Sequence, residues 1–204
     1  MLGLKLMLLS LTQSEMTTSS AIMSAKLMGF SIYENIPHGT SIQYPSTWNK
    51  QELLNNDSTV VVLFLAPIRW SFSSRDDSKI IRNILFNESS TRVLVSIKRS
   101  IALYSTSSAL QSITNDQTHL LNICFDNVNI LETSYDSKMG QIQASKLIYT
   151  YTEALQNHTG KKGMKIISIQ GHKEIIITYS SHIKDFDRYF STVDRMVGSL
   201  MILE

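Results

Sequence analysis

Histidine and carboxylate side chains that could bind a metal ion gather toward the C-terminus. They are His172, Glu174, His182, Asp185 and Asp187. His172 and Glu174 are two residues apart, so they would share one face of a strand, and imidazole and carboxylate groups are ligands of first-row metals. The spacing is not diagnostic of a metal site. The sequence is compatible with weak divalent metal binding, but we favour the interpretation that Lys173, Glu174 and Lys184 solvate an exposed sheet edge, and we assign no metal ligand.

Two further positions carry groups that could do chemistry. Asp76 and Asp77 are adjacent carboxylates that could contact calcium, but that ion takes six to eight oxygen ligands, so two do not make a site. Cys124 could act as a nucleophile. It falls in the apolar pattern of residues 108–125, which predicts a buried and unreactive thiol instead.

The sequence lacks the short motifs that build common catalytic and nucleotide-binding sites. It contains no G-x-S-x-G elbow, no G-x-G-x-x-G loop, no P-loop and no H-E-x-x-H helix. We therefore predict no catalytic residue and no cofactor.

Composition limits the class of protein. The 204 residues are 43% hydrophobic, which is enough for the core of one domain. Nineteen Lys and Arg against 17 Asp and Glu give a net charge of +2, too small for the phosphate-neutralising field of a nucleic-acid binder. The single cysteine excludes an internal disulfide framework and a cysteine-rich zinc site.

The first residues have the outline of a short signal peptide. Lys5 lies in an apolar run that ends at Leu11, and a polar stretch follows from Thr12 to Ser20. The run is far shorter than the roughly 20 apolar residues of a membrane-spanning helix. We predict that residues 1–28 are a signal peptide or a flexible segment, that no transmembrane anchor is present, and that residues 29–204 form the domain.

Short runs with strand patterning dominate from Gly29 onward. Phe30–Tyr33 and Thr40–Tyr44 alternate with period two around the turn signal His38-Gly39, which predicts an opening strand pair. Val60–Leu65 is continuously apolar, which predicts a central strand buried on both faces. Further strands are expected at 92–98, 128–133, 144–152, 163–169 and 174–179. The last three are separated by only a few residues, so they should form antiparallel hairpins.

Two segments have helical spacing instead. In residues 108–125 the apolar positions are Leu110, Ile113, Leu120, Leu121 and Cys124. A second stripe consists of Phe186, Tyr189, Phe190, Val193, Met196, Val197 and Leu200, with Asp185 or Asp187 at the positive end of the helix. We expect this stripe to pack on the sheet. Hairpins with interleaved and terminal helices predict an α+β domain with an antiparallel sheet.

Two stretches are expected to form a contact face for a partner. Residues 68–90 have weak periodicity and hold Trp70, Arg75, Asp76 and Asp77, which predicts a long irregular connection that is functional or disordered. The other stretch is the last hairpin, around Lys173.

Several of these segments together resemble the PsbP-like domain. The resemblance opens with Gly29-Phe-Ser-Ile-Tyr-Glu-Asn35 and Gly39-Thr-Ser-Ile-Gln-Tyr-Pro-Ser-Thr-Trp48. It continues through Leu131-Glu-Thr-Ser134, Met139-Gly140, Tyr149-Thr-Tyr151, Gly171-His-Lys173, Tyr179 and Met196-Val-Gly-Ser-Leu200. The sequence departs from the family where Ile176 or Ile177 replaces a common Tyr and Leu200 replaces a usual Phe. Within this pattern Pro45 should end its strand and Trp48 should cap the core rather than stack on a ligand.

The resemblance implies both a fold and a role. Members of the family have an α-β-α sandwich with a central antiparallel sheet flanked by helices, a fold shared with a Ran GTPase release factor. Plant and cyanobacterial members are extrinsic proteins of photosystem II, and similar bacterial and archaeal domains are exported. The resemblance therefore implies a non-enzymatic binding or assembly module, extracellular or membrane-peripheral, on a protein complex at a membrane or cell surface. Two alternatives remain: an intracellular small-GTPase regulator of the same fold, and an unrecognised hydrolase.

Overall fold

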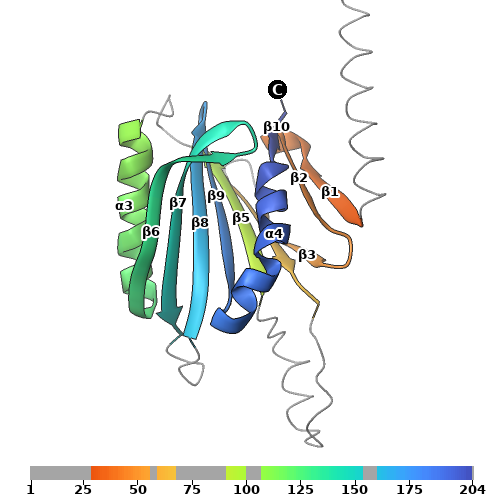
Figure 1. The fold of residues 1–204 in the computed structure, drawn as a ribbon. Coiled ribbons are helices and arrows are strands. Elements are labelled where there is room, and N and C mark those ends of the chain that lie inside the picture. Colours follow the sequence, from red (N-terminus) through yellow and green to blue (C-terminus); the bar gives the residue numbers. More distant parts are fainter. Residues whose placement is uncertain (1–28, 56–58, 68–90, 100–106, 154–159, 204) are drawn as a thin grey trace, which may run out of the picture.

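Two antiparallel sheets, two α-helices and one short 3-10 helix make up the described part of the chain (Figure 1). The structure is a computed structural model, and it describes residues 29–55, 59–67, 91–99, 107–153 and 160–203. The predicted N-terminal segment, the connection at 68–90, and Asp76 and Asp77 within it lie outside the described residues.

The smaller sheet has the order β1-β2-β10, formed by β1 (Phe30–Asn35), β2 (Thr40–Pro45) and β10 (Met201–Ile202). The 3-10 helix η1 (Ile36–His38) connects the first two strands. The Asn35 side chain accepts a hydrogen bond from the His38 backbone at 3.0 Å, and Gly39 ends the turn with a left-handed φ of 54°. The predicted opening pair is confirmed.

The larger sheet has seven strands in the order β3-β4-β5-β9-β8-β7-β6. These strands are β3 (Asn49–Asn55), β4 (Thr59–Leu65), β5 (Arg92–Arg99), β6 (Asp126–Met139), β7 (Ile142–Thr152), β8 (Gly160–Gln170) and β9 (Lys173–His182). The last three are joined antiparallel, as their short connections predict. Strand β3 was not predicted from the sequence.

The prediction for Val60–Leu65 is wrong in two respects. Strand β4 lies second from one end of the sheet, and β9 is the middle strand. Val60, Val62 and Phe64 are fully buried, whereas Val61 and Leu63 on the other face are half-buried. β-Branched and aromatic residues also suit a strand with one half-buried face, so the apolar run alone could not distinguish the two arrangements.

Helices cover both faces of the large sheet. Helix α3 (Ser107–Cys124) packs on β6, β7 and β8, and α4 (Ile183–Gly198) packs on the opposite face together with the small sheet (Figure 1). This arrangement confirms the expected α+β class and the α-β-α sandwich with a central antiparallel sheet.

Helix α4 carries the stripe expected from the sequence. Phe186, Val193, Met196 and Val197 are buried in one core cluster that also includes Leu200, while Tyr189 and Phe190 pack partly buried against it. The same cluster contains residues of β1, β2, β4, β5, β8 and β9, so α4 and both sheets share a single core.

Helix α3 buries Leu110 and Leu121 as predicted, but the rest of its buried face differs from the prediction. Its buried residues are Leu110, Thr114, Gln117 and Leu121. Leu120 is 46% exposed, and Cys124 is exposed, so the expectation of a buried thiol is wrong. Thr114 is satisfied in the interior because its Oγ1 lies 2.6 Å from Oγ of Ser145 and donates to the Leu110 carbonyl oxygen.

The predicted corner at Tyr44-Pro45-Ser46-Thr47-Trp48 is present. The Trp48 backbone donates to the Pro45 carbonyl oxygen at 2.9 Å, and the buried indole meets the Tyr189 ring edge-on with centroids 5.9 Å apart. Trp48 is therefore a core residue, as the sequence predicted.

Candidate functional site

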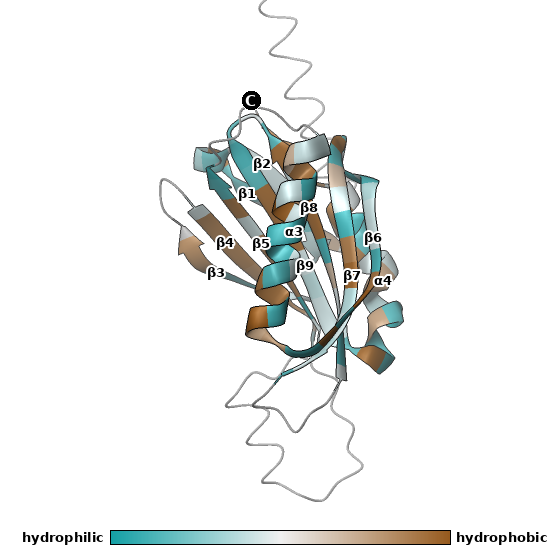
Figure 2. Cartoon of the chain, turned by 90° about the vertical axis from the view of Figure 1, so that its left-hand side faces the viewer, coloured by the Kyte–Doolittle hydropathy of each residue, from teal (hydrophilic) through white to brown (hydrophobic). Residues whose placement is uncertain are grey.

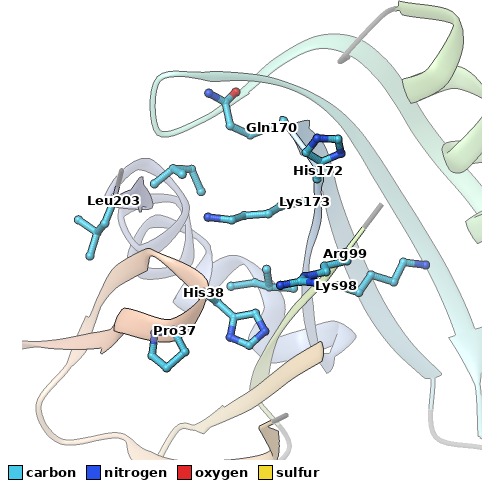
Figure 3. Close-up of a pocket in the computed structure, with 11 residues that line it drawn as sticks. Pro37, His38, Lys98, Arg99, Gln170, His172, Lys173 and Leu203 are labelled. Carbon is cyan, nitrogen blue, oxygen red and sulfur yellow. The ribbon is translucent and has the colours of Figure 1, made fainter. Parts of the chain in front are cut away.

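A basic recess opens at one end of the two sheets (Figure 3). Its volume is about 360 Å³, and its polar lining consists of His38, Lys98, Arg99, Gln170, His172 and Lys173. We call this cavity the basic recess throughout.

Three separate elements bring these side chains together. His38 comes from η1, Arg99 ends β5, and Lys173 begins β9 after the tight turn at Gly171, where φ is +56°. Arg99 and Lys173 are register partners across β5 and β9. In Figure 3, Lys173 and His38 extend from opposite sides of the opening.

The charges of the recess are unbalanced in favour of cations. Lys98 forms an ion pair with Glu174 at 3.0 Å. By strand alternation this pair lies on the opposite face of the sheet from Arg99 and Lys173. Among the described residues that line the recess, none is acidic. Like charges opposite each other destabilise a sheet, so an anion bound between Arg99 and Lys173 would relieve their repulsion.

His38 adds a buried polar atom to the recess. The residue is 8% exposed, and its Nδ1 lies 3.1 Å from Oδ1 of Asn35. Its Nε2 has no hydrogen-bond partner among the described residues. A buried polar atom without a partner costs about 1–3 kcal/mol, so a ligand atom that hydrogen-bonds Nε2 would gain that energy.

The structure separates the candidate metal ligands. His172 lies in the turn before β9, so the expectation that it shares a strand face with Glu174 is wrong. His182 is at the other end of this ten-residue strand. Within the described ranges, no three His, Cys, Asp or Glu residues are placed to hold a metal ion.

The alternative interpretation, an exposed sheet edge, is also wrong. Strand β9 is in the middle of the sheet, and Glu174 is only 7% exposed. Its carboxylate balances Lys98 rather than solvating an edge.

His182 occupies the joint between β9 and α4. Burial lowers the pKa of His182 below its usual 6.5, and the neighbouring Lys161 and Lys184 lower it further. Asp185 follows in the first turn of α4, as predicted, and Asp187 forms an ion pair with Lys162 at 3.4 Å.

Sequence reasoning identified only part of the recess. It singled out the hairpin at Lys173 but missed His38, which it assigned to a turn, and Arg99, which ends a strand. Arg99 and Lys173 meet only because β5 pairs with β9. No local pattern signals that long-range pairing.

None of the helices in the described ranges combines the length and hydropathy needed to cross a bilayer. Comparison with family models and with curated proteins gave no match.

Solved structures do resemble this chain. The cyanobacterial PsbP (CyanoP) of Synechocystis sp. PCC 6803 superposes with a TM-score of 0.57 at 12% identity, covering 85% of this chain and 92% of that one. The Saccharomyces cerevisiae Ran-binding protein Mog1p superposes with a TM-score of 0.51 at 9% identity, covering 86% and 96%. At such identities the likeness concerns the fold alone. The chain therefore has the PsbP-like fold, which it shares with Mog1p.

Proposed function

We propose that the chain is a non-enzymatic binding or assembly module that docks on an acidic surface of a protein complex through the basic recess. The observation that carries the proposal is the pairing of Arg99 with Lys173 in a recess whose described lining has no acidic side chain. Complementary charge gives specificity and speeds encounter with a partner of opposite sign.

The location we propose is extracellular or membrane-peripheral. It is supported by the positively charged, apolar start of the sequence, which has the outline of an export signal. CyanoP and Mog1p share the fold, and Mog1p is a Ran-binding protein. Because one fold hosts many functions, the binding role is argued from the basic recess and not from this likeness in fold.

The test is a charge reversal that spares the fold. The double variant Arg99→Glu, Lys173→Glu alters the recess, and the control Lys138→Glu, Lys184→Glu makes the same change of net charge at exposed positions elsewhere. We expect crosslinked recovery of the native partner complex to fall at least about tenfold for the recess variant only. The reason is that losing one partner of a charge pair buried in an interface costs about 2–5 kcal/mol of binding free energy. Equal recovery by both variants would contradict docking through the recess.

The location of the protein is tested in the cells that produce it. Peptide mass spectrometry of cytosolic, membrane and exported fractions should find a mature N-terminus between about Ala21 and Phe30 outside the cytosol. An intact Met1 confined to the cytosol would contradict export and favour the intracellular small-GTPase regulator.

A further inference from the structure

A second cavity lies beside α3, on the face of the large sheet opposite α4 and the small sheet. Its volume is about 380 Å³. Figure 2 looks onto this face: α3 crosses it, and β3, β4 and β5 extend to one side of the helix. Helix α3 packs on β6, β7 and β8, and residues of β3, β4 and β5 beside it line one side of the cavity.

The strand register arranges this floor from apolar to cationic. Leu63 pairs with Leu94, Leu94 with Thr178, and Thr178 with Lys165, so these four side chains form one row across β4, β5, β9 and β8. Neighbouring strands are about 4.8 Å apart, so the row is roughly 14 Å long. Leu53 of β3, which is 56% exposed, extends the apolar end.

The cationic end holds a partly desolvated charge. Nζ of Lys165 donates to Oε1 of Gln117 at 2.6 Å, which uses one of the three ammonium hydrogens. Gln117 is neutral, so this contact does not balance the charge. Burial lowers the pKa of Lys165, because the ammonium loses contact with water, and the neighbouring Cys124 opposes this shift.

A second cation lines the same cavity. Arg92 donates through Nε to Oγ of Ser180 at 2.9 Å and through a terminal nitrogen to Glu153 at 3.1 Å. Glu153 also accepts from Lys161 at 2.7 Å, so one carboxylate serves two cations. The described lining of the cavity contains no acidic residue.

A mostly apolar cavity with a few convergent polar groups is the usual form of a small-molecule site. We propose that this cavity binds a carboxylate-bearing amphiphile, with the carboxylate at Lys165 and Arg92 and the hydrocarbon chain along Leu94, Leu63 and Leu53. This site is independent of the basic recess, because the residues of its row and the pair Arg99 and Lys173 lie on opposite faces of the sheet.

Calorimetric titration of the full chain with decanoate below its micellar range tests the proposal. We expect saturable one-to-one binding, and no comparable binding of decyltrimethylammonium, which has the same chain and the opposite charge. Lys165→Met keeps an unbranched side chain that is one atom shorter and removes its charge, and Lys138→Met is the control at an exposed lysine. A charge-assisted hydrogen bond contributes about 1.5–3 kcal/mol, so Lys165→Met should weaken decanoate binding at least about tenfold while Lys138→Met leaves it unchanged.

Two further measurements locate the hydrocarbon chain of decanoate in the cavity, and they remain useful if Lys165→Met fails to fold. Leu53→Ser alters an exposed position and should weaken decanoate binding severalfold, because apolar contact area is lost. Nuclear Overhauser contacts should join the decanoate methylenes to the methyl groups of Leu63 and Leu94. Absence of saturable binding, equal binding of the cationic probe, or undiminished affinity in a folded Lys165→Met protein would each overturn the proposal.

Discussion

At the scale of single residues, two glycines with the same backbone conformation have different surroundings. Gly140 has φ of +59°, and a Cβ there would overlap the carbonyl oxygen of Leu200. Its backbone donates to the Val197 carbonyl oxygen at 3.1 Å, which holds the β6–β7 turn against the end of α4. Gly171 has φ of +56°, with nothing within 4 Å of the equivalent position. Of these two positions, only position 140 requires glycine both for its positive φ and because a Cβ has no room there.

Substitution by alanine should separate these two requirements. Gly171→Ala adds only the penalty of a left-handed residue, so we expect the free energy of unfolding to fall by about 1 kcal/mol. Gly140→Ala adds an overlap with backbone that cannot rotate away, and we expect a loss of at least about 2 kcal/mol. Urea denaturation of both variants measures the difference. Equal losses would mean that the chain at Leu200 moves aside at little cost.

Residues were predictable from the sequence where their neighbours in the chain determine their role. The corner at Pro45 and Trp48 is local: Pro45 ends β2, and the chain turns at once to bring the indole onto the core. The recess is not local. His38, Arg99 and Lys173 are far apart in the sequence, and the strand order that joins them depends on which edges pair.

At the scale of elements, the apolar pattern of the sequence did not predict strand β3 or the buried polar residues of α3. Backbone pairing explains the first, and side-chain hydrogen bonds explain the second. Strand β3 has the sequence NKQELLN, which contains no β-branched or aromatic residue, yet its backbone pairs with β4 on both sides of a register shift at Leu53. Helix α3 buries Thr114 and Gln117 because both find partners, in Ser145 and Lys165. A prediction that places only apolar residues on the buried face of a helix therefore misses these two polar residues.

The orientation of α3 can be tested with two adjacent leucines. Leu121 is buried in a cluster with Leu147, Tyr149 and Tyr151, whereas Leu120 points outward. Leu121→Ala should lower the free energy of unfolding by about 2–5 kcal/mol because it leaves a cavity, and Leu120→Ala should change it by less than about 0.5 kcal/mol. Thermal unfolding followed by circular dichroism gives both values. Equal losses would match the apolar pattern of the sequence, which places both leucines on the buried face.

At the scale of the whole molecule, one hydrophobic core joins the two sheets, and α3 packs on a second hydrophobic cluster. Phe64 of β4 contacts Tyr33 and Tyr44 of the small sheet, and α4 packs into the same cluster. The cluster beneath α3 is separate and smaller. Whether residues 29–204 behave as one domain therefore depends on whether α3 unfolds together with the rest.

Two positions provide matched probes of this question. Trp48 lies in the main core and becomes the sole tryptophan in the variant Trp70→Phe, and Cys124, the single cysteine, offers an exposed thiol at the end of α3 for a fluorescent label. We expect Trp48 fluorescence, the Cys124 label and far-ultraviolet circular dichroism to give one urea midpoint. The reason is that the buried residues Ser145 and Leu147 on β7 tie α3 to strands that also carry the main core. An earlier transition at Cys124, in a labelled protein whose circular dichroism midpoint matches that of the unlabelled one, would show that α3 detaches as a separate unit. In that case the amphiphile cavity, but not the basic recess, would change before the domain unfolds, because Gln117 of α3 would no longer hold Lys165. Decanoate should then move the Cys124 transition to higher urea while leaving the Trp48 transition in place.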